Sequence, residues 1–202
     1  MKKTAIMILA AIGLVALSVP GCLEDKVLEI VFTGETFADF SENEDGADEA
    51  ETAFIDVADE IRKILEDNEL TLDDIDDAFV TSVHYGVTSF GQSHDWVVSG
   101  TISVRRVDLG GTSTVIVNYT SQSVQAALGQ KIAAPLEAGG VAVVNTALDD
   151  FRAGANPVLE FEVLHGTISP VPTPADPMIF DWRAWLAIQI VTTTEVEVPD
   201  PF

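Results

Sequence analysis

Two histidines and one aspartate have the types and spacing to be metal ligands. His84 lies within an alternating run of residues, 79–88, and His94 and Asp95 stand at the start of a second run, 95–106. A hairpin formed by these runs would bring the three side chains to the same end, where two imidazoles and a carboxylate can make a metal site. The HxH and HExxH spacings are absent from the sequence. We therefore predict ordinary strand and turn positions and no bound metal, and keep the three residues as candidates.

A further candidate for cation binding is Asp45, in the acidic stretch 41–51. If Ser41 is the first position of an EF-hand loop, then Asp45 is the fifth, a ligand position, and Gly46 is the sixth. The first position should be Asp, and the twelfth, which should be a bidentate Glu, is Thr52. The pattern fails, and we interpret the stretch as a solvated acidic loop.

The sequence contains no motif typical of nucleophilic catalysis or of nucleotide binding. The GxSxG, SxxK, Walker and GxGxxG patterns do not occur, and the one cysteine, Cys22, directly follows an apolar leader. We therefore predict a protein that is not an enzyme and needs no cofactor. The enzymatic alternative is an envelope hydrolase that uses His84 or His94.

Residues 1–21 are organised like a bacterial signal peptide. Lys2 and Lys3 precede an almost unbroken apolar run from Thr4 to Leu17, and no acidic residue occurs before Glu24. Such a run is short for a membrane-spanning helix but typical of the apolar segment of a signal peptide. An ordinary secretory signal cleaved near residues 16–18, or an uncleaved anchor, would share these features.

The end of this leader, Val19-Pro20-Gly21-Cys22, resembles the lipobox of bacterial lipoproteins. The resemblance covers residues 1–22 and implies cleavage between Gly21 and Cys22, a diacylglyceryl group on the Cys22 sulfur, and acylation of the new amino terminus. Two or more acyl chains anchor a protein stably, whereas one holds it only marginally. By analogy with the sorting of Gram-negative lipoproteins, Leu23 favours the outer membrane, facing the periplasm or the cell surface.

The charge of the chain excludes several classes of partner. There are 10 Lys and Arg against 33 Asp and Glu, a formal net charge of −23. Such a surface repels phosphates, so neither nucleic acid nor a layer of anionic headgroups is a suitable partner. With one cysteine no internal disulfide can form, and packing alone must hold the core.

Two helices and a short strand are predicted from the periodicity. The strand covers 27–33, and the first helix covers 52–68. The apolar residues of that helix recur at helical spacing and are Phe54, Val57, Ala58, Ile61, Ile64 and Leu65. The second, alanine-rich helix covers 135–154, with Leu148 on its apolar face and Gly154 at its C-terminal end.

The remaining elements alternate with a period of two. Three runs, 78–90, 95–107 and 108–120, are expected to form a consecutive antiparallel meander, and the pair Gly110-Gly111 indicates a hairpin between the last two. Two more strands, 156–169 and 178–198, flank a proline-rich loop. Trp182 and Trp185 have opposite parity on the last strand, so one should face the core and the other is a candidate for a binding surface.

The predicted order β-α-β-β-β-α-β-β favours an α+β or mainly β fold, an antiparallel domain like a β-sandwich with two helical insertions. We expect a signal peptide at 1–21, a short tether at 22–26 and a single β-rich domain at 27–202. The predicted function is that of a membrane-anchored envelope lipoprotein without enzymatic activity, in a structural or protein-binding role. It would contact membrane lipid through acylated Cys22 and an envelope protein that the sequence does not identify. The alternative is a carrier of a small apolar or lipid ligand, held between the sheet and the helix at 136–153.

Overall fold

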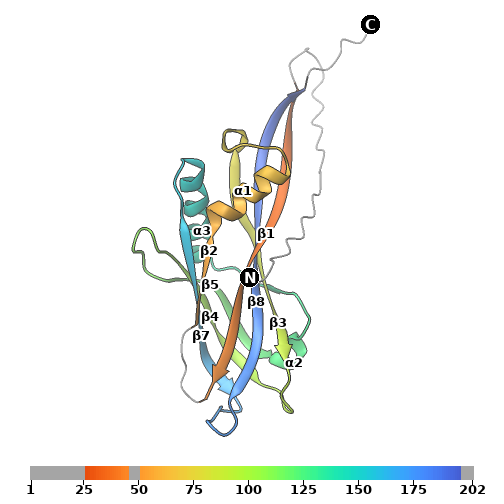
Figure 1. Ribbon diagram of the computed structural model, residues 1–202, viewed down its shortest axis with the longest axis vertical. Coiled ribbons are helices and arrows are strands. Elements are labelled where there is room, and N and C mark those ends of the chain that lie inside the picture. Colours follow the sequence, from red (N-terminus) through yellow and green to blue (C-terminus); the bar gives the residue numbers. More distant parts are fainter. Residues whose placement is uncertain (1–25, 46–50, 197–202) are drawn as a thin grey trace.

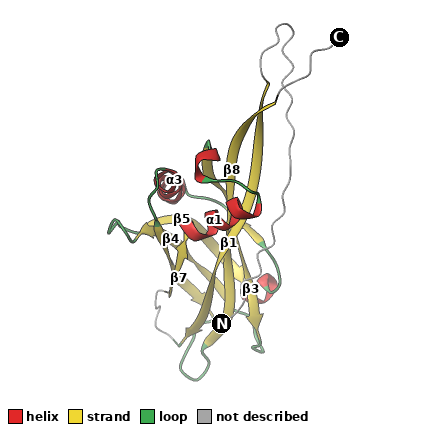
Figure 2. Ribbon diagram, turned by 45° about the horizontal axis from the view of Figure 1, so that its top comes forward, coloured by secondary structure: helices red, strands yellow, loops and turns green. Residues whose placement is uncertain are grey.

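Two antiparallel four-stranded sheets make up most of the computed structural model, which describes residues 26–45 and 51–196 (Figures 1 and 2). The first sheet has the order β1-β8-β3-β6, and the second has the order β2-β7-β4-β5. The strands of the first sheet are β1 (Lys26–Glu44), β8 (Met178–Val196), β3 (Asp77–Phe90) and β6 (Ile132–Ala134). Those of the second are β2 (Glu51–Asp56), β7 (Val158–Ser169), β4 (Val97–Arg106) and β5 (Thr114–Ser123). The expectation of a mainly β, antiparallel fold is confirmed.

Strands β1 and β8 form the longest ladder of the molecule. They pair antiparallel from Lys26 opposite Val196 to Glu44 opposite Met178. The prediction of a loop beginning at residue 41 is wrong for residues 41–44, which continue β1. Alternation along the strand turns Glu42 and Glu44 toward the interior, where both are buried. Burial of acidic side chains there is unexpected from the sequence, because a run of carboxylates is usually solvated.

The first predicted helix, 52–68, begins too early, because residues 52–56 belong to a strand. Residues Glu51–Asp56 form β2, which pairs with β7, and α1 (Val57–Asp67) begins only after Asp56. The side chain of Asp56 accepts a hydrogen bond of 3.1 Å from the Asp59 N–H, which makes it the N-cap that fixes the start of the helix. Phe54 is therefore a strand residue and is 62% exposed, whereas Ile61 and Leu65 are buried as predicted.

The predicted three-stranded meander is also wrong, although its second half is confirmed. Strands β4 and β5 form the expected hairpin, and Gly110 at its turn adopts a φ of +63°. Strand β3, however, pairs with β8 and β6 in the other sheet. The chain crosses between the sheets at residues 91–96, where the fully buried Trp96 donates a hydrogen bond to Gln92 Oε1 over 2.7 Å. With this indole buried, the chain passes between the sheets to reach β4 and does not form a hairpin with β3.

Helix α3 (Ala138–Arg152) packs against β3, β4 and β5. Val144, Leu148 and Phe151 are buried, as their spacing predicts. A Cβ atom on Gly140 would lie 2.5 Å from Ile116, so this glycine allows the helix to approach β5 closely. Gly154 follows the helix with a φ of +91° and confirms the predicted C-terminal end. The short helix α2 (Val124–Ala127) was not predicted.

The last part of the chain follows the sequence prediction closely. Leu159, Phe161 and Val163 of β7 face the core, and the proline-rich residues 170–177 form the loop that leads to β8. Trp182 is buried, while Trp185 on the other face is partly covered by Lys131 and Arg183. No helix in residues 26–45 and 51–196 is long and apolar enough to cross a membrane.

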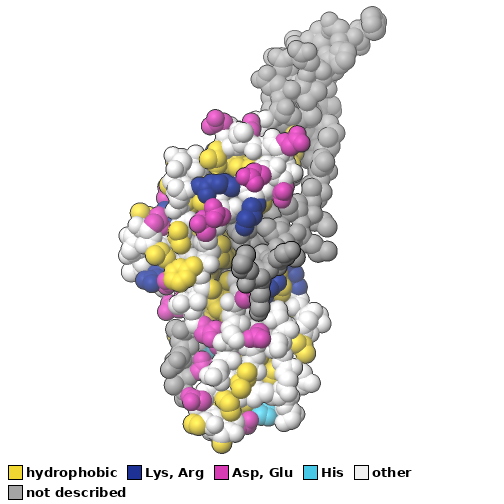
Figure 3. All heavy atoms as spheres, in the orientation of Figure 1, with side chains coloured by type: hydrophobic (Ala, Val, Ile, Leu, Met, Phe, Trp, Pro, Cys, Tyr) yellow, Lys and Arg dark blue, Asp and Glu magenta, His cyan; other side chains and the backbone are white. Residues whose placement is uncertain are grey.

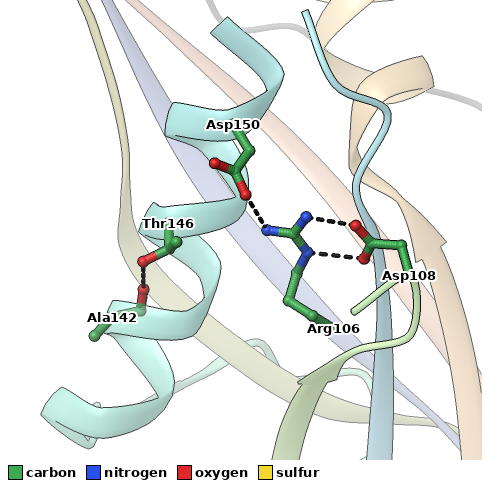
Figure 4. A network of polar contacts seen from close by, with 5 residues as sticks. All are labelled: Arg106, Asp108, Ala142, Thr146 and Asp150. Carbon is green, nitrogen blue, oxygen red and sulfur yellow. Dashed lines mark hydrogen bonds and ion pairs between the residues drawn. The ribbon is translucent and has the colours of Figure 1, made fainter. Parts of the chain in front are cut away.

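A nearly buried arginine ties α3 to the end of β4 (Figure 4). The Arg106 guanidinium, 7% exposed, donates to both carboxylate oxygens of Asp108 over 2.5 and 2.8 Å and to Asp150 of α3 over 2.8 Å. The hydrogen bonds that Arg106 donates to Asp108 raise the pKa of Arg106 above its ordinary range, and they outweigh the opposite effect of burial. The cation is thus paired on both sides, as a buried charge must be.

We expect Arg106→Met to lower the free energy of unfolding by about 2 kcal/mol, because it leaves two partly buried carboxylates without their shared cation. Urea unfolding followed by tryptophan fluorescence measures the loss. Arg62→Met is the matched control, since Arg62 pairs with Asp59 at an exposed position; it should cost less than about 1 kcal/mol. Equal losses in the two variants would contradict a special role for the Arg106 pair.

Candidate functional site

The structure does not bring the sequence-predicted metal candidates together. His84 is a ladder residue of β3, opposite Trp185 of β8, and the hairpin that was to join it to His94 does not exist. His94 lies in the crossover, with Nε2 3.5 Å from Asp176 Oδ2. Asp45 is exposed just after β1.

Asp95 has a structural role at the start of α2. Its carboxylate accepts hydrogen bonds from the Gln125 N–H over 2.8 Å and from the Ser123 hydroxyl over 2.5 Å. In the part of the chain that is described, no group of three or more His, Cys, Asp or Glu side chains is arranged to hold a metal ion. The predicted lipidation and cleavage residues, Cys22 and Gly21, lie outside the described residues.

A different set of polar side chains is buried between the two sheets. The Trp182 indole Nε1–H donates to Glu42 Oε1 over 2.6 Å, and Glu42 Oε2 lies 3.1 Å from His165 Nε2. On the other side of the imidazole, His165 Nδ1 lies 2.6 Å from the Tyr119 hydroxyl. Glu42 is 1% exposed and His165 is 4% exposed. These four residues form a continuous indole–carboxylate–imidazole–phenol chain, which we call the buried polar chain.

The elements that carry this chain belong to both sheets. Glu42 and Trp182 come from β1 and β8 of the first sheet, whereas His165 and Tyr119 come from β7 and β5 of the second. Gly100 of β4 makes room for the phenol, because a Cβ atom there would lie 2.6 Å from the Tyr119 oxygen and would also meet the Leu164 carbonyl. The polar chain therefore links the two sheets.

Two further carboxyl groups lie close to the chain. Glu44 is buried on the same face of β1 as Glu42, and Glu51 of β2 accepts a hydrogen bond of 3.0 Å from the Ser41 N–H. Burial raises the pKa of Glu51 from 4.5 to about 7, and repulsion from Glu42 adds to this effect. The hydrogen bond from Ser41 and the nearby His165 lower this pKa without cancelling the rise.

A small cavity borders the buried polar chain. It has a volume of about 30 Å³, and Tyr119, His165 and Trp182 form part of its wall. The half-buried Tyr85 and Gln122 also line it and are joined by a hydrogen bond of 3.0 Å from the Tyr85 hydroxyl to Gln122 Oε1. Such a cavity has room for one or two water molecules and none for a lipid.

The chain has the connectivity of an acid–base relay. A carboxylate that faces one imidazole nitrogen fixes the tautomer or the charge of the ring, and the other nitrogen can then exchange a proton with a hydroxyl. The relay ends at a cavity of water size, so it can move protons between buried groups but offers no space for an organic substrate. This geometry supports proton binding more directly than turnover.

The ligand-carrier alternative finds no support in the packing of α3. Val144, Ala147 and Leu148, which belong to the stretch expected to border a ligand cavity, are fully buried. The cavity beside Tyr119 is lined by β3, β4, β5, α2, β7 and β8, and a second cavity of about 10 Å³ lies between the two sheets.

The buried polar chain was not predicted from the sequence, although the alternation of inward and outward residues along the strands indicates part of it. His165 follows Leu159, Phe161 and Val163 at two-residue spacing on a predicted strand, so it could have been placed inside. Glu42 continues the inward positions of Ala38 and Phe40, but this holds only once β1 is known to extend beyond residue 40.

Gly100→Ala is expected to lower the free energy of unfolding by about 1–3 kcal/mol, because the added methyl group must displace the Tyr119 phenol or the strand behind it. Urea unfolding gives the loss, and the ring signals of His165 in NMR spectra should shift as its hydroxyl partner moves. Gly91→Ala is the control, since a Cβ atom at Gly91 would meet no atom within 4 Å. Unchanged His165 signals in Gly100→Ala would contradict the proposed contact.

No protein-family model and no curated protein match this chain. What the protein does must therefore be inferred from its own residues. The long β1–β8 ladder and the buried polar chain are the structural features that bear on function.

Proposed function

We propose that this protein is a non-enzymatic envelope lipoprotein, held in the membrane by lipid on Cys22, and that its domain is a β-sandwich in a structural or protein-binding role. The anchor rests on the resemblance of residues 1–22 to a lipoprotein leader. The proposed role of the domain rests on one geometric observation, the length and direction of the β1–β8 ladder from its start at Lys26.

Strand β1 begins at Lys26, four residues after Cys22, and runs for 19 residues. At about 3.3 Å per residue its two ends are roughly 60 Å apart. Figure 1 shows the ladder running down the molecule, with the start of β1 and the end of β8 at the top and the loop 170–177 at the bottom. An anchor at Cys22 would attach near the upper end and leave the lower end, which we call the distal end, free for contact.

The side chains of the distal end suit contact with another protein. Val171 is 75% exposed and Ile179 is 49% exposed, and Figure 3 shows hydrophobic and acidic side chains gathered there. Along β8 the most distal basic residue is Arg183, and most of the other basic residues of the described chain belong to α1, the end of β4 and α3, which lie away from the distal end in Figure 1. Apolar residues in an acidic surround favour a partner with apolar and basic groups.

The proposal of a non-enzymatic role is supported by the small space beside the buried polar chain. The buried polar chain is the one titratable arrangement with relay geometry that we find among the described residues, and the cavity beside it admits only water-sized molecules. A binding or structural role does not require a cavity large enough for a substrate.

Cys22→Ala is expected to move the full-length protein from the membrane fraction of a bacterial host to the soluble envelope fraction, because it removes the only thiol that can carry lipid. Fractionation and immunoblotting measure the distribution, and intact-mass measurement should show the added acyl groups only with Cys22 present. Ser18→Ala, within the leader but outside the lipobox, is the control. An unchanged membrane fraction in Cys22→Ala would refute the lipid anchor.

A further inference from the structure

The edge of β1 is held against the second sheet by a carboxyl group. The Ser41 N–H, which β8 does not use, donates instead to Glu51 Oε2 of β2 over 3.0 Å. The Ser41 hydroxyl in turn donates to Asp181 of β8 over 2.6 Å. The Glu51 carboxyl thus joins a strand of one sheet to a strand of the other, at the point where β1 would otherwise present a bare edge.

The surroundings of this carboxyl are strongly acidic. From β1 it faces the buried Glu42 and Glu44, and from β7 it faces His165. The further ionisable groups around this junction are Tyr119 of β5, which acts through His165, and the exposed Asp181 of β8. Among these groups His165 alone can carry a positive charge, and it already lies 3.1 Å from Glu42.

The carboxyl groups of Glu42 and Glu44 lie near that of Glu51, and their charges add to the effect of burial in opposing ionisation of Glu51. A proton on one of them removes a negative charge and supplies a donor that a neighbouring carboxylate can accept. Glu51 is the least buried of the three carboxyl groups, and its side chain can reach solvent. Ionisation of Glu51 therefore requires the smallest rearrangement of the surrounding structure.

We propose that Glu51 is a proton-controlled latch, which holds the edge of β1 against β2 while the carboxyl is protonated and releases it when the carboxyl ionises. The released side chain turns to solvent, the Ser41 N–H loses its acceptor, and water reaches the Glu42–His165 pair. The latch lies toward the distal end, so it gives an envelope protein a way to couple external pH to the shape of that end. It does not depend on the lipid anchor.

The pKa of about 7 in the folded protein sets where the latch should act. Because this value is raised above the ordinary 4.5, the folded state binds the proton more tightly than the unfolded state does. The stabilisation from Glu51 is therefore complete below about pH 4.5 and is lost as the pH rises through 7. Above that range the ionised carboxylate favours the released position.

The test is amide hydrogen exchange at Ser41, measured by NMR on the folded domain between pH 5.5 and 8.5 and corrected for the intrinsic exchange rate. The protection factor of the Ser41 amide should fall about tenfold across this range, with a midpoint near 7. The Trp182 indole N–H, which donates to Glu42, should change its chemical shift in the same transition.

Two variants separate the latch from the general effect of pH on an acidic protein. Glu51→Gln keeps the shape of the protonated carboxyl and should make both signals independent of pH, with a melting temperature above that of the unmodified protein at pH 8.5. Glu29→Gln removes the same charge from an exposed position on β1, the strand that carries Ser41, and should leave the transition unchanged.

Three results would overturn the proposal. The first is a Ser41 protection factor that stays constant with pH, and the second is one that rises with pH, as a simple hydrogen bond to a carboxylate would give. The third is a transition in Glu51→Gln that matches that of the unmodified protein.

Discussion

The pairing of β1 with β8 is the constraint on which the rest of the structure depends. Their register places Phe40 opposite Trp182, with the rings stacked 4.4 Å apart, and so fixes which residues of β1 face the interior. Two residues further, the same alternation buries Glu42. A slip of one residue would turn Glu42 to solvent but would also expose Phe40, so the aromatic contact and the buried carboxylate are inseparable.

A carboxylate in this position is tolerated because its neighbours are polar on both sides. The Trp182 N–H and the His165 ring face its two oxygens, and Tyr119 completes the set on the far nitrogen of His165. Such a buried pair adds little net stability, because desolvation offsets the attraction between the two groups. Ionisation of Glu51 beside this site is opposed by burial and by the charge of Glu42.

The sequence predicts those parts of the fold that local periodicity determines. The inward residues of β7, the β4–β5 hairpin and the end of α3 at Gly154 were found because each signal lies within a few residues. The sheet to which β3 belongs depends on pairing with β8, far along the chain, and Phe54 fits a helical and a strand pattern equally well. The buried polar chain was missed for the same reason, since Glu42 and His165 meet only when both sheets are assembled.

The two ends of the molecule are held together by different kinds of interaction, and this separates what is rigid from what can respond. Near the start of β3 and the end of β4, α3 closes the sheets through buried apolar residues and the paired Arg106. At the distal end the contacts between the sheets include a few titratable groups, among them Glu42, His165 and Glu51. Protons can change those contacts without disturbing the apolar packing under α3. A change in protonation should therefore remain local to the end that the protein would present to a partner.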